Sequence, residues 1–421
     1  MIDLNEKKIR DMNHQERLDF IKNRADLDDN EISLFKDNSI LKFEDVNNMV
    51  ENAVGTFQIP LGIANNFVIN DKEYLIPMAI EEPSVIAASS NAAKIVKDSG
   101  GFMAKSSNSI MIGQIQLVSI DDHFKDVDKS IKIIIENKTE LINLANTKSK
   151  FARCIDLQTR KIKDETINNF GTMVIVEIFV DTKDAMGANV VNTMCESIAP
   201  KIESLTKEQI ILKILSNYAT KRLVQCKGVF PKSLIGGDQM VKRILFSYAF
   251  AYSDVYRAVT HNKGIMNGID SVAIATGQDF RAIESGCHAY ACKDGHYRSL
   301  TKWYKDSNGD LVGEIEIPLA VGIVGGITNI HPLVKTCLKI LKIKSAQELS
   351  MVIAAVGLAQ NFSAIRALAN EGIQKGHMKL HSKNIAKIAG ASLDQIEKIS
   401  QQMIDEGNIS VSMAKEIMDH R

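Results

Sequence analysis

Four ionisable side chains lie among apolar or glycine-bearing neighbours, where an unpaired buried charge would be costly. Lys263 lies in a stretch with two glycines, Asp279 follows the apolar run 271–276, Glu82 ends another apolar run, and His377 follows a glycine. They supply a cation, two carboxylates and an imidazole, which acid-base chemistry at a carbonyl needs. Taken singly, the lysine also fits a solvated loop, the acids fit helix caps and the histidine fits a surface position.

Two glycine-containing segments, 184–189 and 322–326, could bring backbone amides close to a phosphate. Glycine that allows tight packing explains each segment equally well. The sequence has neither GxGxxG after a predicted strand nor GxxxxGK[ST], which argues against a standard Rossmann domain.

The overall charge is balanced, with 51 Lys and Arg residues against 51 Asp and Glu residues. We therefore expect no nucleic-acid partner and no attraction to an anionic membrane. The first residues lack the pattern of a secretion signal, and no run of about 20 apolar residues follows. The expected protein is soluble and cytoplasmic.

No metal site is expected. The six cysteines form no CxxC pair, which argues against a zinc knuckle or a disulfide framework. His288 with Cys292 and His377 with His381 have i,i+4 spacing, but neither pair has an adequate third ligand.

The elements that must position these groups change along the chain. Short polar helices are predicted up to about residue 45, then β-rich runs at 51–62 and 74–80, then a helix that begins near Pro83. Glu82 is thereby expected at a strand-to-helix junction, where amide dipoles favour a carboxylate.

Residues 110–217 read as a β-α-β-α insertion, with a strongly predicted strand at 172–180. The following block alternates Ala-rich helices with strands predicted at 271–276 and 314–318, which would place Asp279 at a strand end. Ser345 and Glu348 form a capping box that begins a long buried helix.

Seven ordered stretches closely resemble the soluble, bacterial class II type of 3-hydroxy-3-methylglutaryl-CoA (HMG-CoA) reductase. They are ENAVGTFQIPLG from Glu51, PMAIEEPSVIAAS from Pro77, DAMGANVVNTM from Asp184, HNKGIMNGI from His261, TGQDFRA from Thr276, GIVGGIT from Gly322 and GHMKLHSKN from Gly376.

The resemblance implies an α+β fold, in which a large mixed α/β substrate domain carries an inserted small ferredoxin-like cofactor domain and a C-terminal helical flap. The expected boundaries are 1–109 and 218–374 for the large domain, 110–217 for the small NAD(P)-binding domain, and 375–421 for the flap.

The implied activity is the interconversion of HMG-CoA with mevalonate plus CoA by two successive hydride transfers, as in the mevalonate pathway of isoprenoid biosynthesis. By motif matching, Lys263 would stabilise the oxyanion and Glu82 would donate a proton to the carbonyl oxygen. Asp279 would hydrogen-bond to both, and His377 would protonate the departing CoA thiolate.

The resemblance also implies binding residues. The hydroxymethylglutaryl group would be bound by Ser84, Arg257, Asn267 and Asn361. The cofactor would be bound near Asp156, Asp184, Met186, Gly187, Ala188 and Asn189. A ribose contact by Asp156 slightly favours NADH, whereas Arg153, Arg160, Lys161 and Lys163 could accept NADPH.

The implied assembly is a homo-oligomer built from dimers, with the active site at the dimer interface and the segment from Glu51 to Gly62 helping to form it. Two other functions stay open. One is another NAD(P)-dependent acyl-CoA reductase or hydroxy-acid dehydrogenase, and the other is a non-catalytic protein that binds CoA or a nucleotide.

Overall fold

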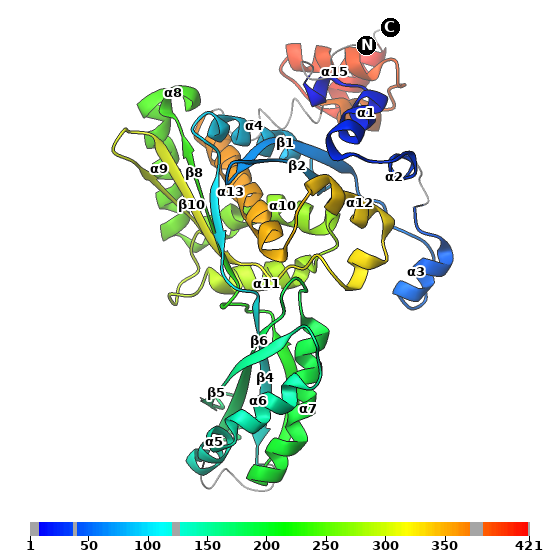
Figure 1. Ribbon diagram of the computed structural model, residues 1–421. Helices are drawn as coiled ribbons and strands as arrows, with labels where there is room; N and C mark the ends of the chain where they lie inside the picture. The colour runs from blue at the N-terminus through cyan, green and yellow to red at the C-terminus, as the bar shows by residue number, and fades with distance from the viewer. Residues whose placement is uncertain (1–7, 37–39, 120–126, 371–381, 420–421) are drawn as a thin grey trace.

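The computed structural model describes residues 8–36, 40–119, 127–370 and 382–419. The fold is mixed α/β (Figure 1). A large body at the top of this view carries an inserted unit that projects downward, and a group of helices follows at the C-terminus.

The large body contains an antiparallel sheet of order β3-β8-β10-β9 and a hairpin formed by β1 and β2. Its strands are β1 (Leu61–Ile69), β2 (Lys72–Ala79), β3 (Met103–Ser106), β8 (Leu223–Phe230), β9 (Thr301–Lys305) and β10 (Leu311–Pro318). Its helices are α4 (Val85–Lys97), α8 (Lys232–Ile235), α9 (Gly237–Ser253), α10 (Val255–Ala275), α11 (Phe280–Tyr290), the 3-10 turn η2 (Gly326–Asn329), α12 (Pro332–Leu341) and α13 (Ala346–Asn370).

Helix α13 is the central core helix, and the backbone amide of Glu348 is capped by the Ser345 hydroxyl as predicted. It packs against α10, where a Cβ on Gly268 would lie 3.0 Å from the Val356 carbonyl oxygen. The length and composition of α13 would suit a membrane span, but 67% of its apolar window is buried inside the protein. Helix α13 therefore serves as a core helix.

The strand predicted at 271–276 is wrong, because residues 271–275 continue α10. Ile265, Ile269 and Val272 are buried at helical spacing, so the apolar run is the end of a buried helix face. Lys263 consequently lies on a helix and Asp279 follows one. The strand predicted at 314–318 is confirmed within β10.

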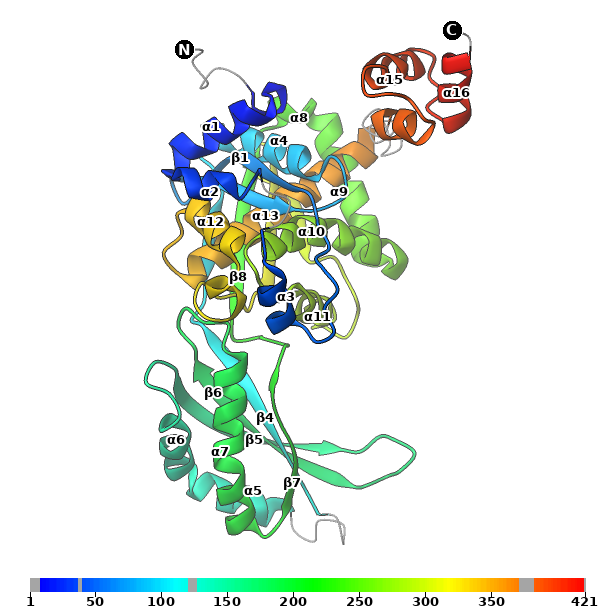
Figure 2. The ribbon, with the colours of Figure 1, turned by 90° about the vertical axis from the view of Figure 1, so that its right-hand side faces the viewer.

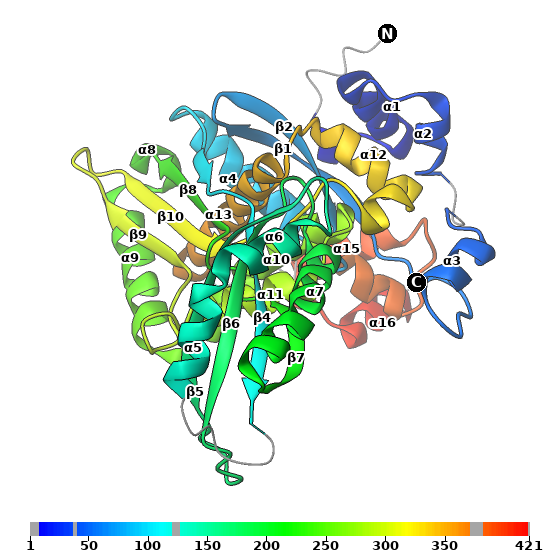
Figure 3. The same ribbon diagram turned by 60° about the horizontal axis from the view of Figure 1, so that its bottom comes forward.

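The inserted unit is a second antiparallel sheet, of order β5-β6-β4-β7, with its own apolar core. Figure 3 shows α5 and α6 beside β5 and β6, and α7 beside β7. The elements are β4 (Ile110–Val118), α5 (Val127–Glu136), α6 (Lys138–Asn146), β5 (Arg153–Lys163), β6 (Thr172–Asp181), α7 (Ala188–Thr206) and β7 (Gln209–Ser216). The strand predicted at 172–180 is thus confirmed.

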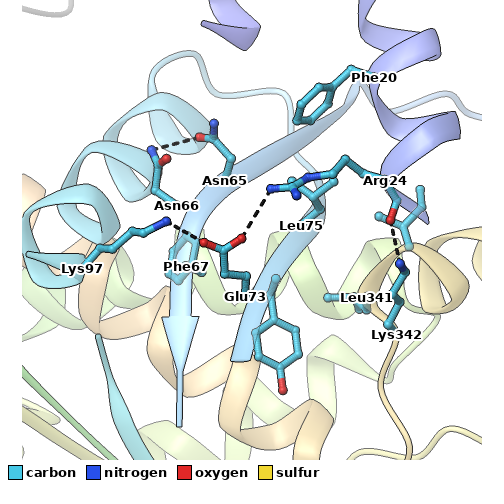
Figure 4. Close-up of a pocket in the computed structure, with 12 residues that line it drawn as sticks. Phe20, Arg24, Asn65, Asn66, Phe67, Glu73, Leu75, Lys97, Leu341 and Lys342 are labelled. Carbon is cyan, nitrogen blue, oxygen red and sulfur yellow. Dashed lines mark hydrogen bonds and ion pairs between the residues drawn. The ribbon is translucent and has the colours of Figure 1, made fainter. Parts of the chain in front are cut away.

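The N-terminal elements are η1 (Ile9–Asp11), α1 (His14–Ala25), α2 (Asp29–Ser33) and α3 (Phe43–Met49). A pocket of about 200 Å³ lies between α1 and the β1–β2 hairpin. Its Glu73 carboxylate accepts hydrogen bonds from Lys97 at 2.6 Å and Arg24 at 3.4 Å (Figure 4). The Arg24 bond ties α1 to the large body.

The C-terminal helices comprise residues 382–388, α15 (Ile396–Asp405) and α16 (Val411–Asp419). They have a small core of their own, which includes Ala386, Ile399 and Met403. In Figure 2 these helices lie beyond the end of α13, to one side of the large body.

Candidate active site

Glu82, Lys263 and Asn267 meet in the described chain. Glu82 lies between β2 and α4, whereas Lys263 and Asn267 are one turn apart on α10. The Lys263 Nζ lies 2.8 Å from Glu82 Oε2, and Asn267 Nδ2 donates to the same oxygen at 3.1 Å. The structure therefore joins a predicted acid to a predicted oxyanion-stabilising cation.

Ser84 has an unusual backbone conformation two residues from Glu82. Its φ is +79°, in the left-handed region that L-residues rarely adopt, and it is the residue that precedes α4. Its Oγ is buried without a hydrogen-bond partner among the described residues. Local strain and an unsatisfied hydroxyl both occur preferentially at ligand sites.

Asp279 is not hydrogen-bonded to Glu82 or Lys263 within the described part of the single chain, so the expected contacts are not formed there. Its carboxylate instead caps α11 by accepting from the Ala282 amide at 3.0 Å, and it pairs with Arg281 at 3.1 Å. The Asp279 side chain is 40% exposed and open to further contacts. His377 lies outside the described residues.

The two other predicted substrate residues have contrasting surroundings. Arg257 is half-buried, its guanidinium has no ion-pair partner among the described residues, and burial lowers its pKa. Asn361 is fully buried and is bonded to His261, Thr301 and Trp303. Arg257 is therefore available to a carboxylate, whereas Asn361 belongs to an internal network.

The Glu82–Lys263 pair is open to solvent in the single chain. The Lys263 side chain is 61% exposed, and Tyr256 and Val259 are exposed on the same face of α10. Neither the pocket beside α1 nor a cavity of about 1050 Å³ beside β3, β8 and β10 includes the pair. Because a charge stabilises an oxyanion best where water is excluded, a working site requires a cover.

The start of α7 has the features of an anion site. Gly187 precedes the helix at φ +104°, and a Cβ there would lie 2.3 Å from Thr182 Cγ2. No side chain caps this helix among the residues that the structure describes, so its first N–H groups remain available. The residues predicted to bind a nicotinamide cofactor, 184–189, therefore fit its phosphates.

Asp156 on β5 already has partners. Its carboxylate pairs with Lys138 and accepts from Gln158 Nε2 and the Leu157 amide, and the Lys138 hydrogen bond lowers its pKa. Two of the nearby cations are also paired: Arg160 lies 2.8 Å from Glu177, and Lys161 lies 2.7 Å from Asp128.

Two contacts near these groups gave no recognisable signal in the sequence. Arg222 is hydrogen-bonded to the 184–189 segment, and Gln278, which directly precedes Asp279, is hydrogen-bonded to Gly322. Within the described ranges no cluster of three or more His, Cys, Asp or Glu side chains could hold a metal.

The fold therefore has two parts, with the Glu82–Lys263 pair in the large body and, in the inserted unit, a helix start that no described side chain caps. The hydroxymethylglutaryl-coenzyme A reductase family matches residues 13–382. A reductase of this name from Archaeoglobus fulgidus is 48% identical over 96% of this chain and 92% of its own length. A probable HMG-CoA reductase from Borreliella burgdorferi is 40% identical over 80% of this chain and 77% of its own length.

Solved structures of HMG-CoA reductases align with nearly the whole chain. An HMG-CoA reductase from Streptococcus pneumoniae aligns with a TM-score of 0.81 and 36% identity, over 98% of each chain. A class II structure from the same organism, bound to NADPH in open conformations, aligns with a TM-score of 0.80 and 37% identity, over 97% of this chain and 99% of its own.

The chain belongs to the HMG-CoA reductase family and is of the class II type. It is an NAD(P)-dependent oxidoreductase that interconverts HMG-CoA with mevalonate and CoA, and the two other functions left open by the sequence are not favoured.

Proposed function

We propose that Lys263 and Glu82 carry the chemistry of this reductase. The observation that supports the proposal is the 2.8 Å contact between Lys263 Nζ and Glu82 Oε2. A carbonyl oxygen bound beside this pair would meet a cation that stabilises its developing negative charge and an acid that delivers its proton. Asn267 holds the shared Glu82 oxygen in place.

We assign the other predicted residues to the same substrate, HMG-CoA. Arg257 binds its free carboxylate, because the guanidinium is half-buried without a charged partner among the described residues. Ser84 binds the hydroxymethylglutaryl group through its hydroxyl, which has no hydrogen-bond partner among the described residues. Asp279 joins Glu82 and Lys263 when the site is closed, and His377 protonates the CoA thiolate. Asn361 supports this site from the core.

We propose that residues 1–109 and 218–374 form the substrate domain, and that 110–217 form the cofactor domain. The strand order β5-β6-β4-β7 of the latter is that of a ferredoxin-like fold. When bound at the start of α7, the reduced nicotinamide supplies the hydride for each reduction. The Asp184 side chain is held in place because its Oδ1 accepts a hydrogen bond from the Ala346 amide at 2.8 Å. Met186, Ala188 and Asn189 belong to the same cradle.

We propose a homodimer in which the partner and the flap, 375–421, cover the open pair. Exposed apolar side chains support this assembly: Val54 is 100% exposed and Phe57 is 93% exposed, and Tyr256 and Val259 adjoin Lys263. The burial of α13 supports a soluble protein, and the balanced charge gives it no attraction to an anionic membrane, so we place it in the cytoplasm.

Lys263→Ala tests the catalytic assignment. We expect kcat to fall by about a thousandfold or more in every half-reaction, with cofactor affinity kept within about twofold. Lys305→Ala, on β9, removes another partly exposed lysine and should leave kcat unchanged. Turnover by Lys263→Ala close to that of the unaltered protein would reject the oxyanion role.

A further inference from the structure

Arg222 is a buried cation between the two parts of the molecule. It lies between β7 and β8 and is only 3% exposed. Burial lowers the pKa of its guanidinium to about 10, an effect that the nearby Asp181 and Asp184 oppose. A charge is rarely buried unless it is well paired or has a task. No carboxylate contacts this guanidinium among the described residues, so its hydrogen bonds must offset the free-energy cost of burying the charge.

The hydrogen bonds of Arg222 join two separate segments. Its Nη1 donates to Thr182 Oγ1, the Ala185 carbonyl and the Met186 carbonyl, each at 3.1 Å. Its Nη2 donates to the carbonyl of Val321. One side chain therefore ties the segment before α7 to the segment that follows β10.

The second segment is packed tightly against the first. A Cβ on Gly322 would lie 2.5 Å from the Met186 amide nitrogen, so only glycine allows this approach. The Ile323 amide donates to the Asp184 carbonyl at 2.9 Å. A shift of one segment would therefore displace the other.

Gln278 extends the connection to Asp279. Its Nε2 donates to the Gly322 carbonyl at 2.9 Å, and its Oε1 accepts from the Gly322 amide at 2.8 Å. Gln278 directly precedes Asp279, which caps α11. A path of hydrogen bonds and peptide bonds thus runs from the segment before α7, through Arg222, Val321–Gly322 and Gln278, to Asp279.

We propose that Arg222 is a positioning residue that fixes the cofactor-binding segment 184–189 against Val321–Gly322 and, through Gln278, in register with Asp279. The inference rests on the proposed cofactor site. Its physical reason is that the guanidinium satisfies four oxygens at once, three of them backbone carbonyls of the segments that must stay aligned.

Arg222→Met keeps much of the volume but removes every donor. We expect the KM for the reduced cofactor to rise by about tenfold or more, while the KM for HMG-CoA stays within about twofold. Arg222→Lys retains a buried donor and should restore part of the cofactor affinity. Loss of packing alone would not produce this selective effect or its rescue by lysine.

Thr182→Val is the second test if Arg222→Met does not fold, because at nearly constant shape it removes one acceptor of Arg222, together with the bonds of that hydroxyl to the Ser109 and Ala185 carbonyls. We expect a rise of about threefold in the cofactor KM alone. An unchanged cofactor KM in the folded variants, or an equal rise in both KM values, would overturn the role of Arg222.

Asn189→Asp tests the cofactor site separately, because it places a negative charge at the exposed start of α7, where it favours the helix but repels phosphates. An unchanged cofactor KM in this variant would overturn the site and the role of Arg222 with it. A raised KM here, with no effect of the Arg222 and Thr182 variants, would overturn the role of Arg222 alone.

Discussion

The Oε2 atom of Glu82 accepts hydrogen bonds from both Lys263 and Asn267. Family resemblance predicted these residues, but their spacing in the sequence did not show that they meet. The helix cap that the sequence left open for Asp279 is confirmed in the single chain, where its carboxylate accepts from the Ala282 amide and pairs with Arg281. Every helix start leaves backbone N–H groups without partners inside the helix. A side chain that caps them is therefore less available for long-range contacts.

Asp156 gives a prediction about cofactor choice. Its carboxylate should repel the 2′-phosphate of NADPH. Asp156→Asn should therefore lower the ratio of kcat/KM with NADH to kcat/KM with NADPH by about fivefold. Lys138 partly neutralises this carboxylate, so Lys138→Ala should shift the ratio in the opposite direction.

Parallel kinetics with both cofactors measure these ratios, and Lys201→Ala is a matched control because that lysine of the inserted unit pairs with Glu140 instead. A shift in the same direction for the Asp156 and Lys138 variants would contradict the proposed ribose contact.

At the scale of elements, α10 and α11 are linked by a carboxyl pair. Asp270 on α10 shares a hydrogen bond with Glu284 on α11, and burial, with the Glu284 hydrogen bond and charge, raises the pKa of Asp270. The hydrogen bond from His288 lowers the pKa of Glu284, and His288 also contacts the Tyr297 hydroxyl at 2.6 Å. The helix that carries Lys263 is thereby tied to the helix that Asp279 caps.

This pair predicts a pH dependence of stability. The unfolded chain loses the Asp270 proton at about pH 4, whereas the folded chain keeps it, so this group makes the free energy of unfolding fall as pH rises towards the folded pKa. Asp270→Asn keeps a donor for Glu284 but cannot titrate. Its urea midpoint should fall less between about pH 5 and pH 7 than that of the unaltered protein. Equal pH slopes would contradict the assignment.

Element prediction failed where the apolar pattern was interrupted. His261, Asn262 and Lys263 break the apolar face of α10, and its glycines suggested a loop. The apolar run that remained, 271–276, was short enough to fit either a strand or a helix. Gly268 instead serves the close packing of α10 against α13, a tertiary cause that no local pattern reveals. The Ser345 cap of α13 and the strand β6 were predictable because their signals are local.

At the scale of the molecule, the exposed face of α10 predicts assembly. Val259→Glu places a charge on the apolar surface beside Lys263, so we expect it to convert a dimer to a monomer and to lower kcat by about tenfold or more. Ile167→Glu, in the exposed turn between β5 and β6, is the control that should change neither the oligomeric state nor kcat. Light scattering and activity measured on the same samples provide the test, and an active Val259→Glu dimer would contradict the interface.

The start of the inserted unit was predictable from the sequence, because the residue pattern changes at residue 110, where β4 begins. Its junction with the large body was not, since Arg222 and Gln278 act through backbone carbonyl and amide groups that any residue carries. Sequence reasoning finds side chains that suit a reaction more readily than the contacts that align two parts of a molecule.

The stoichiometry of the reaction tests the central claim most directly. With HMG-CoA as the substrate, the loss of reduced nicotinamide absorbance is compared with the free thiol released. We expect two reduced cofactors to be consumed for each CoA freed, because the thioester must be reduced first to the aldehyde level and then to the alcohol. One cofactor per CoA, or no consumption that depends on the substrate, would contradict the account.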